Sequence, residues 1–231
     1  MQKKNCEYTC NENTLECFYS CDGVPSGSYL LTVSDSALKQ IRGTFRKGKE
    51  FGGTMDVYMD DPSSMKGSLE LSNLTDWGKT DRVNLSHGMF EFHTHPSKCD
   101  QKSCYMDPPS SMDISIVSND WHNGNVVHFV FSRDGAYAMS VDDSTRIRLR
   151  EVHSSRGRRA MESEIGKMVD QAKQLEAEFD DMNGSGGVPK SSSRSVRDSF
   201  RSRYISRMKG AGVTITFFPN EINPSVRVPV T

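Results

Sequence analysis

The stretch Glu91-Phe-His-Thr-His-Pro96 carries the most specific pattern in the sequence. It ends an apolar run, residues 88–95, that predicts a β-strand. Because side chains alternate between the two faces of a strand, His93 and His95 point the same way and can bring two ring nitrogens to one metal ion. With six histidines and nine prolines in the chain, His-x-His-Pro is expected by chance roughly 0.006 times, so the pattern is informative.

A second motif follows at Ser110 and Asp113, which are three residues apart at the start of a predicted helix and so share one face. Asp113 adds a hard oxygen ligand to the two histidines and leaves one position open. Three protein ligands and an open position are typical of catalytic zinc. Ser110 can donate a hydrogen bond to a developing oxyanion. The competing interpretations are an N-cap for Ser110 and an ordinary first-turn acid for Asp113.

A hydrolytic zinc site also requires a base, and Glu50 is the candidate. Zinc lowers the pKa of a bound water to about 7, and a nearby carboxylate takes the proton and passes it to the leaving amine. Glu50 precedes Phe51-Gly-Gly53, where missing side chains leave room for backbone or substrate to approach. Alternatively, Glu50 is a surface acid in the charged run with Lys47 and Lys49.

The set of Glu50, His93-Thr-His95-Pro96 and Ser110-x-x-Asp113 resembles the JAMM/MPN+ family of zinc metalloproteases over about residues 28–150. The resemblance implies an α/β fold with a mixed, mostly antiparallel sheet flanked by helices, similar to cytidine deaminases. It also implies that His93, His95 and Asp113 bind zinc. Glu50 would then be the general acid/base, and Ser110 the oxyanion donor.

The chain departs from this family in the loop between the two motifs. Fourteen residues, 96–109, separate the second histidine from Ser110, whereas the family has a shorter spacer, and they include Cys99 and Cys104. We expect this active-site loop to shape or cover the cleft, with its two cysteines either joined or inert. JAMM-like proteins of large DNA viruses resemble the chain in carrying cysteines there.

Many members of the family cut isopeptide bonds at the C-terminus of ubiquitin or ubiquitin-like proteins. The sequence therefore predicts a zinc-dependent metalloprotease or isopeptidase whose substrate is a ubiquitin-like conjugate or another polypeptide. The alternative is a structural or assembly component, such as a minor capsid protein in the virion of a large DNA virus, since some members keep the fold as a scaffold. Its partners would then be neighbouring subunits. A deaminase is disfavoured because no His-x-Glu with a Pro-Cys-x-x-Cys occurs.

The N-terminal segment 1–27 is rich in cysteine. Its four cysteines form two Cys-x3-Cys pairs: Cys6, Cys10, Cys17 and Cys21. If each pair lay on a helix it would share one face, and four thiolates could close a structural zinc site; disulfides and free thiols are the alternatives. No signal peptide is recognisable, and no run approaches the roughly 20 apolar residues of a membrane span. We therefore expect a cytoplasmic or, alternatively, a virion protein, and a cytoplasmic location favours reduced or metal-bound cysteines.

Strands and helices alternate through residues 28–150, the region that resembles the catalytic domain. The expected strands cover residues 29–33, 50–59, 68–71, 88–95, 126–131 and 136–141, and the expected helices begin at residues 34 and 110. A long helix occupies most of residues 151–182, from residue 158 on. A Gly/Ser-rich linker spans residues 183–195, and a basic helix with a terminal strand and tail covers residues 196–231.

Charge is unevenly distributed near the C-terminus. Residues 162–181 hold seven acids against two lysines, and residues 190–209 hold seven basic residues against one acid. The simplest interpretation is two solvated helix faces that attract each other, and the alternative is an arm that docks an acidic partner. Nucleic acid is disfavoured because the net charge is −1 and only Phe200 and Tyr204 interleave with the basic residues.

Overall fold

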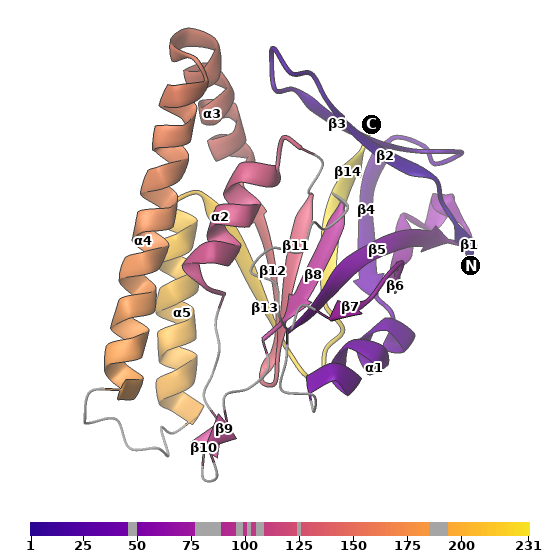
Figure 1. Cartoon of the computed structure of the whole chain (residues 1–231). Helices are drawn as coiled ribbons and strands as arrows, with labels where there is room; N and C mark the ends of the chain where they lie inside the picture. Colours follow the sequence, from indigo (N-terminus) through magenta and orange to yellow (C-terminus); the bar gives the residue numbers. More distant parts are fainter. Residues whose placement is uncertain are drawn as a thin grey trace.

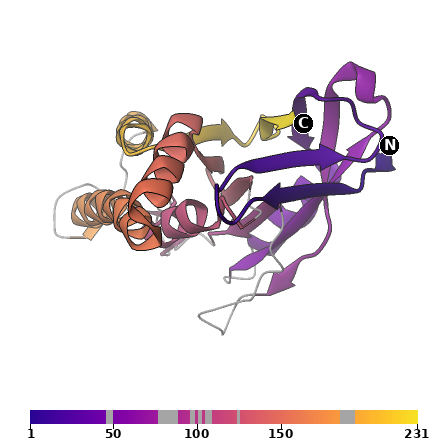
Figure 2. The same cartoon turned by 90° about the horizontal axis from the view of Figure 1, so that it is seen from above.

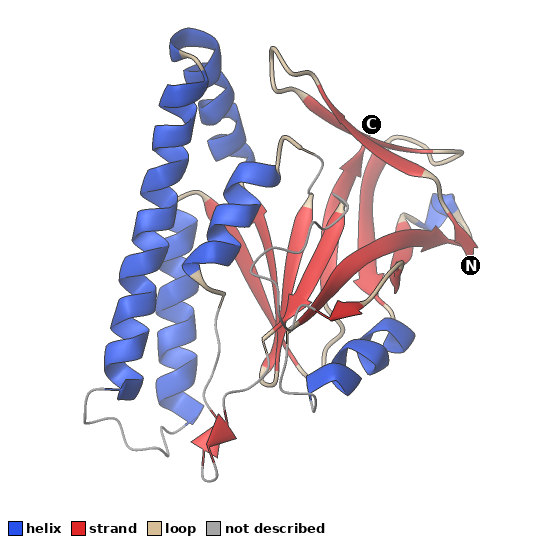
Figure 3. Ribbon diagram, viewed as in Figure 1, coloured by secondary structure: helices blue, strands red, loops and turns tan. Residues whose placement is uncertain are grey.

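The protein folds into an α/β structure in which a mixed, curled sheet carries helices (Figure 1, Figure 3). A computed structural model describes residues 1–45, 50–76, 89–95, 99–100, 103–104, 109–123, 126–184 and 194–231. The α/β class expected from the sequence is confirmed. Among the described residues, no helix combines the length and the apolar composition needed to span a membrane.

The main sheet is built from strands that lie far apart in the sequence. Its strands are β1 (Gln2–Lys3), β4 (Gly27–Val33), β5 (Phe51–Met59), β6 (Lys66–Leu71), β7 (Thr75–Asp76), β8 (Phe90–Thr94), β11 (Val127–Ser132), β12 (Gly135–Val141), β13 (Val213–Pro219) and β14 (Ser225–Val230). The order is β13-β12-β11-β8-β5-β6-β4-β14, and β1 and β7 each pair with β5. The pairs β8–β11 and β4–β6 are parallel, and the other strand pairs described in this sheet are antiparallel.

Five α-helices occur in the described residues: α1 (Asp35–Thr44), α2 (Ser111–Asp120), α3 (Asp143–Arg156), α4 (Arg158–Gly184) and α5 (Arg194–Gly210). A short 3-10 helix, η2 (Pro62–Ser64), precedes β6. Helices α2 to α5 gather on one side of the sheet, as the view from above also shows (Figure 2). Residues 185–193, the centre of the expected linker, lie outside the described part.

Two hydrophobic cores lie on the two faces of the sheet, and the alternation of side chains separates them. Phe90 and Phe92 of β8 pack in the core that includes Leu38 and Ile41 of α1. Val130 of β11 belongs to the other core, which is closed by the α4 residues Met161, Ile165, Met168, Ala172 and Leu175. The predicted apolar stripe of the long helix is therefore confirmed. Residues of β8 with odd numbers face the side of α2.

The N-terminal cysteines lie on a hairpin, formed by β2 (Cys6–Cys10) and β3 (Cys17–Cys21), and not on helices. Disulfides join Cys6 to Cys21 and Cys10 to Cys17, so the expectation of reduced or metal-bound cysteines is wrong for these four. Residues four apart on a strand share a face, and the antiparallel register places each cysteine opposite its partner. The hairpin covers the sheet, because Tyr19 is buried and packs edge-on against Phe90.

The acidic and basic helices attract each other, as the simplest interpretation of the charge pattern predicts. Arg207 of α5 donates to Glu178 of α4 at 2.6 Å, and Arg203 lies 3.7 Å from the same carboxylate. Phe200 and Tyr204 of α5 are buried in the core. Strands β13 and β14, from the segment 196–231, pair at the two ends of the sheet, so this segment contributes to the same sheet as residues 28–150.

Removal of either disulfide should destabilise the fold through the hairpin. The paired cysteines are 15 and 7 residues apart, so chain entropy predicts losses of about 3 kcal/mol for Cys6→Ser/Cys21→Ser and about 2 kcal/mol for Cys10→Ser/Cys17→Ser. Urea unfolding of each double variant measures the loss. Alkylation of all four thiols in the native, unreduced protein, detected by mass spectrometry, would contradict the pairing.

Candidate metal centre

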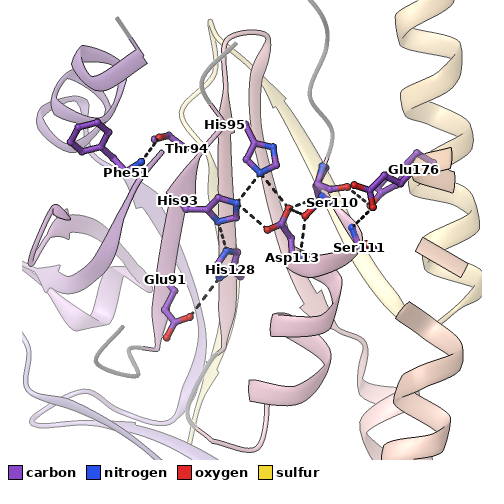
Figure 4. A network of polar contacts seen from close by, with 12 residues as sticks. Phe51, Glu91, His93, Thr94, His95, Ser110, Ser111, Asp113, His128 and Glu176 are labelled. Carbon is purple, nitrogen blue, oxygen red and sulfur yellow. Dashed lines mark hydrogen bonds and ion pairs between the residues drawn. The ribbon is translucent and has the colours of Figure 1, made fainter. Parts of the chain in front are cut away.

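The two histidines of the His-x-His-Pro motif lie at the end of β8 and face α2 (Figure 4). His93 is 2% exposed and His95 is 6% exposed, so both imidazoles are withdrawn from solvent. Thr94 points to the opposite side of the strand, and its hydroxyl accepts a hydrogen bond from the backbone N–H of Phe51. The predicted alternation is therefore confirmed.

Asp113 comes to the same place from α2. Ser110 is the N-cap of this helix and Asp113 is its third residue, and together they form a capping box. Both the backbone N–H and the hydroxyl of Ser110 donate to Asp113 Oδ2, at 2.6 and 2.8 Å, and the Asp113 N–H donates to Ser110 Oγ at 3.3 Å. The cap fixes the carboxylate, which is 4% exposed, against the sheet.

Donor atoms of three residues converge between β8 and α2, with both oxygens of Asp113 facing the histidines. His93 Nε2 lies 2.9 Å from His95 Nε2 and 3.0 Å from Asp113 Oδ1, and His95 Nε2 lies 3.4 Å from Asp113 Oδ2. Donors that share one ion at usual bond lengths are separated by about 3.3 Å in tetrahedral geometry and about 3.0 Å on one face of an octahedron. The buried group of His93, His95 and Asp113 could therefore hold a metal ion.

The electrostatics of the group suit metal binding. Burial lowers the pKa of His93 from 6.5 to about 4, although the Asp113 carboxylate opposes this shift. His93 is therefore neutral at neutral pH, and a neutral imidazole has the lone pair that a metal requires. Burial alone would raise the pKa of Asp113, but the two histidines together outweigh it and hold the pKa well below its usual range.

Glu50, the expected base, lies directly before β5 and is exposed. Gly52 pairs with His93 at the last pair of the antiparallel β5–β8 ladder, and Glu50 lies two residues beyond this pair, at the end of the ladder toward which His95 also lies. The expected room at Gly53 is taken by backbone and not by substrate, because the carbonyl of Asn73 occupies the place of a β-carbon. Lys47 and Lys49 lie outside the described residues.

Ser110, the expected oxyanion donor, is a helix cap in this structure, and a role toward substrate stays a prediction. In the loop 96–109 the described backbone forms two short strands, β9 (Cys99–Asp100) and β10 (Ser103–Cys104). Their antiparallel register places Cys104 opposite Cys99. The side chains of both cysteines lie outside the described part, so the staple predicted for this loop stays a prediction.

The C-terminal helices hold the segment that presents Asp113. Tyr204 of α5 donates to the carbonyl of Pro109 at 2.7 Å, and Glu176 of α4 accepts from the backbone N–H of Ser111 at 3.1 Å. Burial raises the pKa of Tyr204 well above its usual value, and the charge of Asp113 adds to this shift. Helices α4 and α5 are therefore part of the candidate site and not only an appended arm.

Two further residues of the site were not predicted from the sequence. His128 Nε2 lies 2.7 Å from His93 Nδ1, and Glu91 Oε2 lies 3.6 Å from His128 Nδ1 (Figure 4). A signal for both was present: Glu91 shares the strand face of His93, and His128 is the one polar residue in the apolar run 126–131. The pattern of this run predicts only a strand of a hairpin.

Comparison of the chain with family models, with curated proteins and with solved structures finds no match. The class of the fold and the geometry of the site therefore carry the functional argument.

The low pKa of His93 predicts that the metal-free protein loses stability in acid. The unfolded chain binds a proton near pH 6.5 and the folded chain only near pH 4, so the contribution of His93 is complete above pH 6.5 and is lost as the pH falls toward 4. The loss at a pH of about 4.5 is expected to reach about 2–3 kcal/mol.

Urea unfolding with a chelator, at a pH of about 7.5 and of about 4.5, measures this loss. His93→Gln is the matched control because it lacks the titrating group. Between the two pH values its loss of stability should be smaller than that of the wild type by about 2–3 kcal/mol. Equal losses in the two proteins would show that His93 titrates normally in the fold.

Proposed function

We propose that the chain is a zinc-dependent metallopeptidase of the JAMM type, a hydrolase of peptide or isopeptide bonds that include those of ubiquitin-like conjugates. The observation that carries the proposal is the convergence of His93, His95 and Asp113 at the end of β8, buried and within ligand distance of one another. The two histidines lie at the end of a strand and Asp113 in the first turn of a helix, as expected from the resemblance to JAMM/MPN+ metalloproteases. The fold of that family is part of the proposal.

The donor set supports zinc by its chemistry. Imidazole and carboxylate ligands with an open position are typical of catalytic zinc, and two histidines with one carboxylate also bind Fe(II) in oxygenases. The donor separations fit both metals. We choose zinc because the chain also offers Glu50 as the carboxylate that hydrolysis needs near the ion. When bound, zinc supplies Lewis-acid polarisation and a water of lowered pKa.

The residues of the chain would divide the remaining work. Glu50, two residues beyond the Gly52–His93 pair, would take a proton and pass it to the leaving amine. The Ser110 hydroxyl donates its one proton to Asp113 in the capping box, so it would have to turn away from that carboxylate to donate to the oxygen that becomes negative during the reaction. Helices α4 and α5 would keep Asp113 in place through Glu176 and Tyr204.

The metal is tested first by its amount and identity. The purified protein should contain about one zinc per chain by elemental mass spectrometry. His95→Ala should remove the zinc, because the two remaining donors bind the ion more weakly than three do. Thr94→Ser, on the opposite face of the same strand, is the matched control and should keep the ion. Iron in place of zinc would contradict the peptidase and favour an oxygenase.

The role of Glu50 separates binding from chemistry. Glu50→Gln should retain zinc and lose hydrolysis of a panel of ubiquitin dimers by at least about 100-fold, because the amide cannot accept the proton. Glu12→Gln, an exposed position in the loop of the N-terminal hairpin, is the control and should cleave like the wild type. Undiminished cleavage by Glu50→Gln would refute the assignment.

A structural role remains the second candidate, and the disulfides favour it. Disulfides persist in oxidising surroundings and are rare in the cytosol, so the hairpin joined by Cys6–Cys21 and Cys10–Cys17 suits a particle that is oxidised after assembly. A scaffold or minor capsid component should occur in many copies in purified particles. Absence of the chain from such particles, or cleavage of conjugates by the isolated chain, would count against this candidate.

A further inference from the structure

Behind the candidate metal centre, a chain of buried polar groups leads away from the three donors. His93 Nδ1 lies 2.7 Å from His128 Nε2, and His128 Nδ1 lies 3.6 Å from Glu91 Oε2. His93 and Glu91 are each 2% exposed, and His128 is fully buried. Figure 4 shows the three side chains in a row on the side of His93 that is remote from Asp113.

The sheet itself fixes this row. In the parallel β8–β11 ladder His128 pairs with Glu91, and Val130 pairs with His93. Paired residues on neighbouring strands project from the same face, so the Glu91 carboxylate and the His128 ring lie side by side, and His93 lies one step further along β8. The arrangement therefore follows from backbone pairing and not from mobile surface side chains.

We infer that Glu91, acting through His128, sets the ring tautomer of His93 so that the Nε2 lone pair of His93 is free to bind the ion shared with His95 and Asp113. Both residues are positioning residues, since neither lies among the three donors. The inference rests on the proposed metal site, whose His93 ligand it concerns.

Two ring nitrogens 2.7 Å apart share one proton in a hydrogen bond. Which of the two histidines is the donor decides whether His93 can bind a metal through Nε2. If His128 donated, His93 would carry its own proton on Nε2 and could offer no lone pair there. If His93 donates from Nδ1, its Nε2 is free, and the proton of His128 sits on Nδ1, toward Glu91. Histidines that bind metals commonly donate their second N–H to a carboxylate, a backbone carbonyl or a water, and His128 Nε2 takes the place of that acceptor for His93.

Glu91 selects the second arrangement by its charge. The separation of 3.6 Å from His128 Nδ1 is too long for a hydrogen bond, but a carboxylate in a buried environment strongly favours a proton on the nearer nitrogen. Asp113 Oδ1 lies 3.0 Å from His93 Nε2 and by its charge favours a proton on that nitrogen, which is the tautomer that cannot bind the ion through Nε2. Glu91 and His128 thus oppose the tautomer that would exclude the ion.

The acceptor function of His128 is tested by two substitutions of opposite character. His128→Leu removes the acceptor and should weaken zinc binding roughly 10–100-fold in competition with a chromophoric chelator. His128→Gln, whose amide oxygen can accept from His93, should retain more of the affinity. A packing role predicts the reverse order, because a buried leucine is tolerated better than a poorly paired amide.

Phe129→Leu supplies the matched control. It changes the next residue on β11, which is also fully buried but belongs to the core on the α1 side, so zinc affinity should stay within about two-fold of wild type. An affinity for zinc in His128→Leu equal to that of the wild type would overturn the inference.

The tautomers are measured directly by nitrogen NMR of the metal-free protein labelled at histidine, because a bound ion would itself force the proton of His93 onto Nδ1. His93 and His128 should both carry their proton on Nδ1, and Glu91→Leu should mix the tautomers of His128. A proton on His128 Nε2 in the wild type would overturn the inference.

The outcomes separate this inference from the proposed activity. Zinc binding with the expected order of variants, but no cleavage of any conjugate, supports the positioning role and removes the peptidase. A wild-type chain that binds no zinc overturns both.

Discussion

The buried carboxylate of Asp113 is the constraint around which the site is organised. A carboxylate withdrawn from water is costly unless hydrogen bonds or an opposite charge compensate it. Two donors of Ser110 compensate one of its oxygens, and the nitrogens of His93 and His95 lie against the carboxylate. A divalent cation among these groups would complete the compensation. Buried Ile114 and Val117 hold α2 on the sheet, and the contacts of Glu176 with Ser111 and of Tyr204 with Pro109 fix its first turn, so packing outside the site keeps this group in place.

Much of the fold and the three converging residues could be predicted from sequence because they depend on local rules. The alternation along 88–95 predicted the face of His93 and His95, and the spacing of Ser110 and Asp113 predicted their shared turn. Helix α3 was missed because Ile147 is exposed and only Thr145 and Leu149 are buried, which gives no apolar stripe.

Other features could not be predicted because they depend on non-local pairing. Strand β14 contains Pro229 and is defined only by its partner β4, which lies at the other end of the sequence. The contact of His128 with His93 likewise depends on the β8–β11 register. The cysteines were misjudged because a cytoplasmic location was assumed, whereas hairpin register decides that Cys6 meets Cys21 and Cys10 meets Cys17.

Zinc K-edge absorption spectroscopy of the native protein tests the central claim most directly, because it reports the donors around the ion. The account predicts a first shell of nitrogen and oxygen at about 2.0–2.1 Å with the outer-shell pattern of two imidazoles. Sulfur at about 2.3 Å would place the metal on cysteine and contradict the account, as would a native chain that carries no zinc.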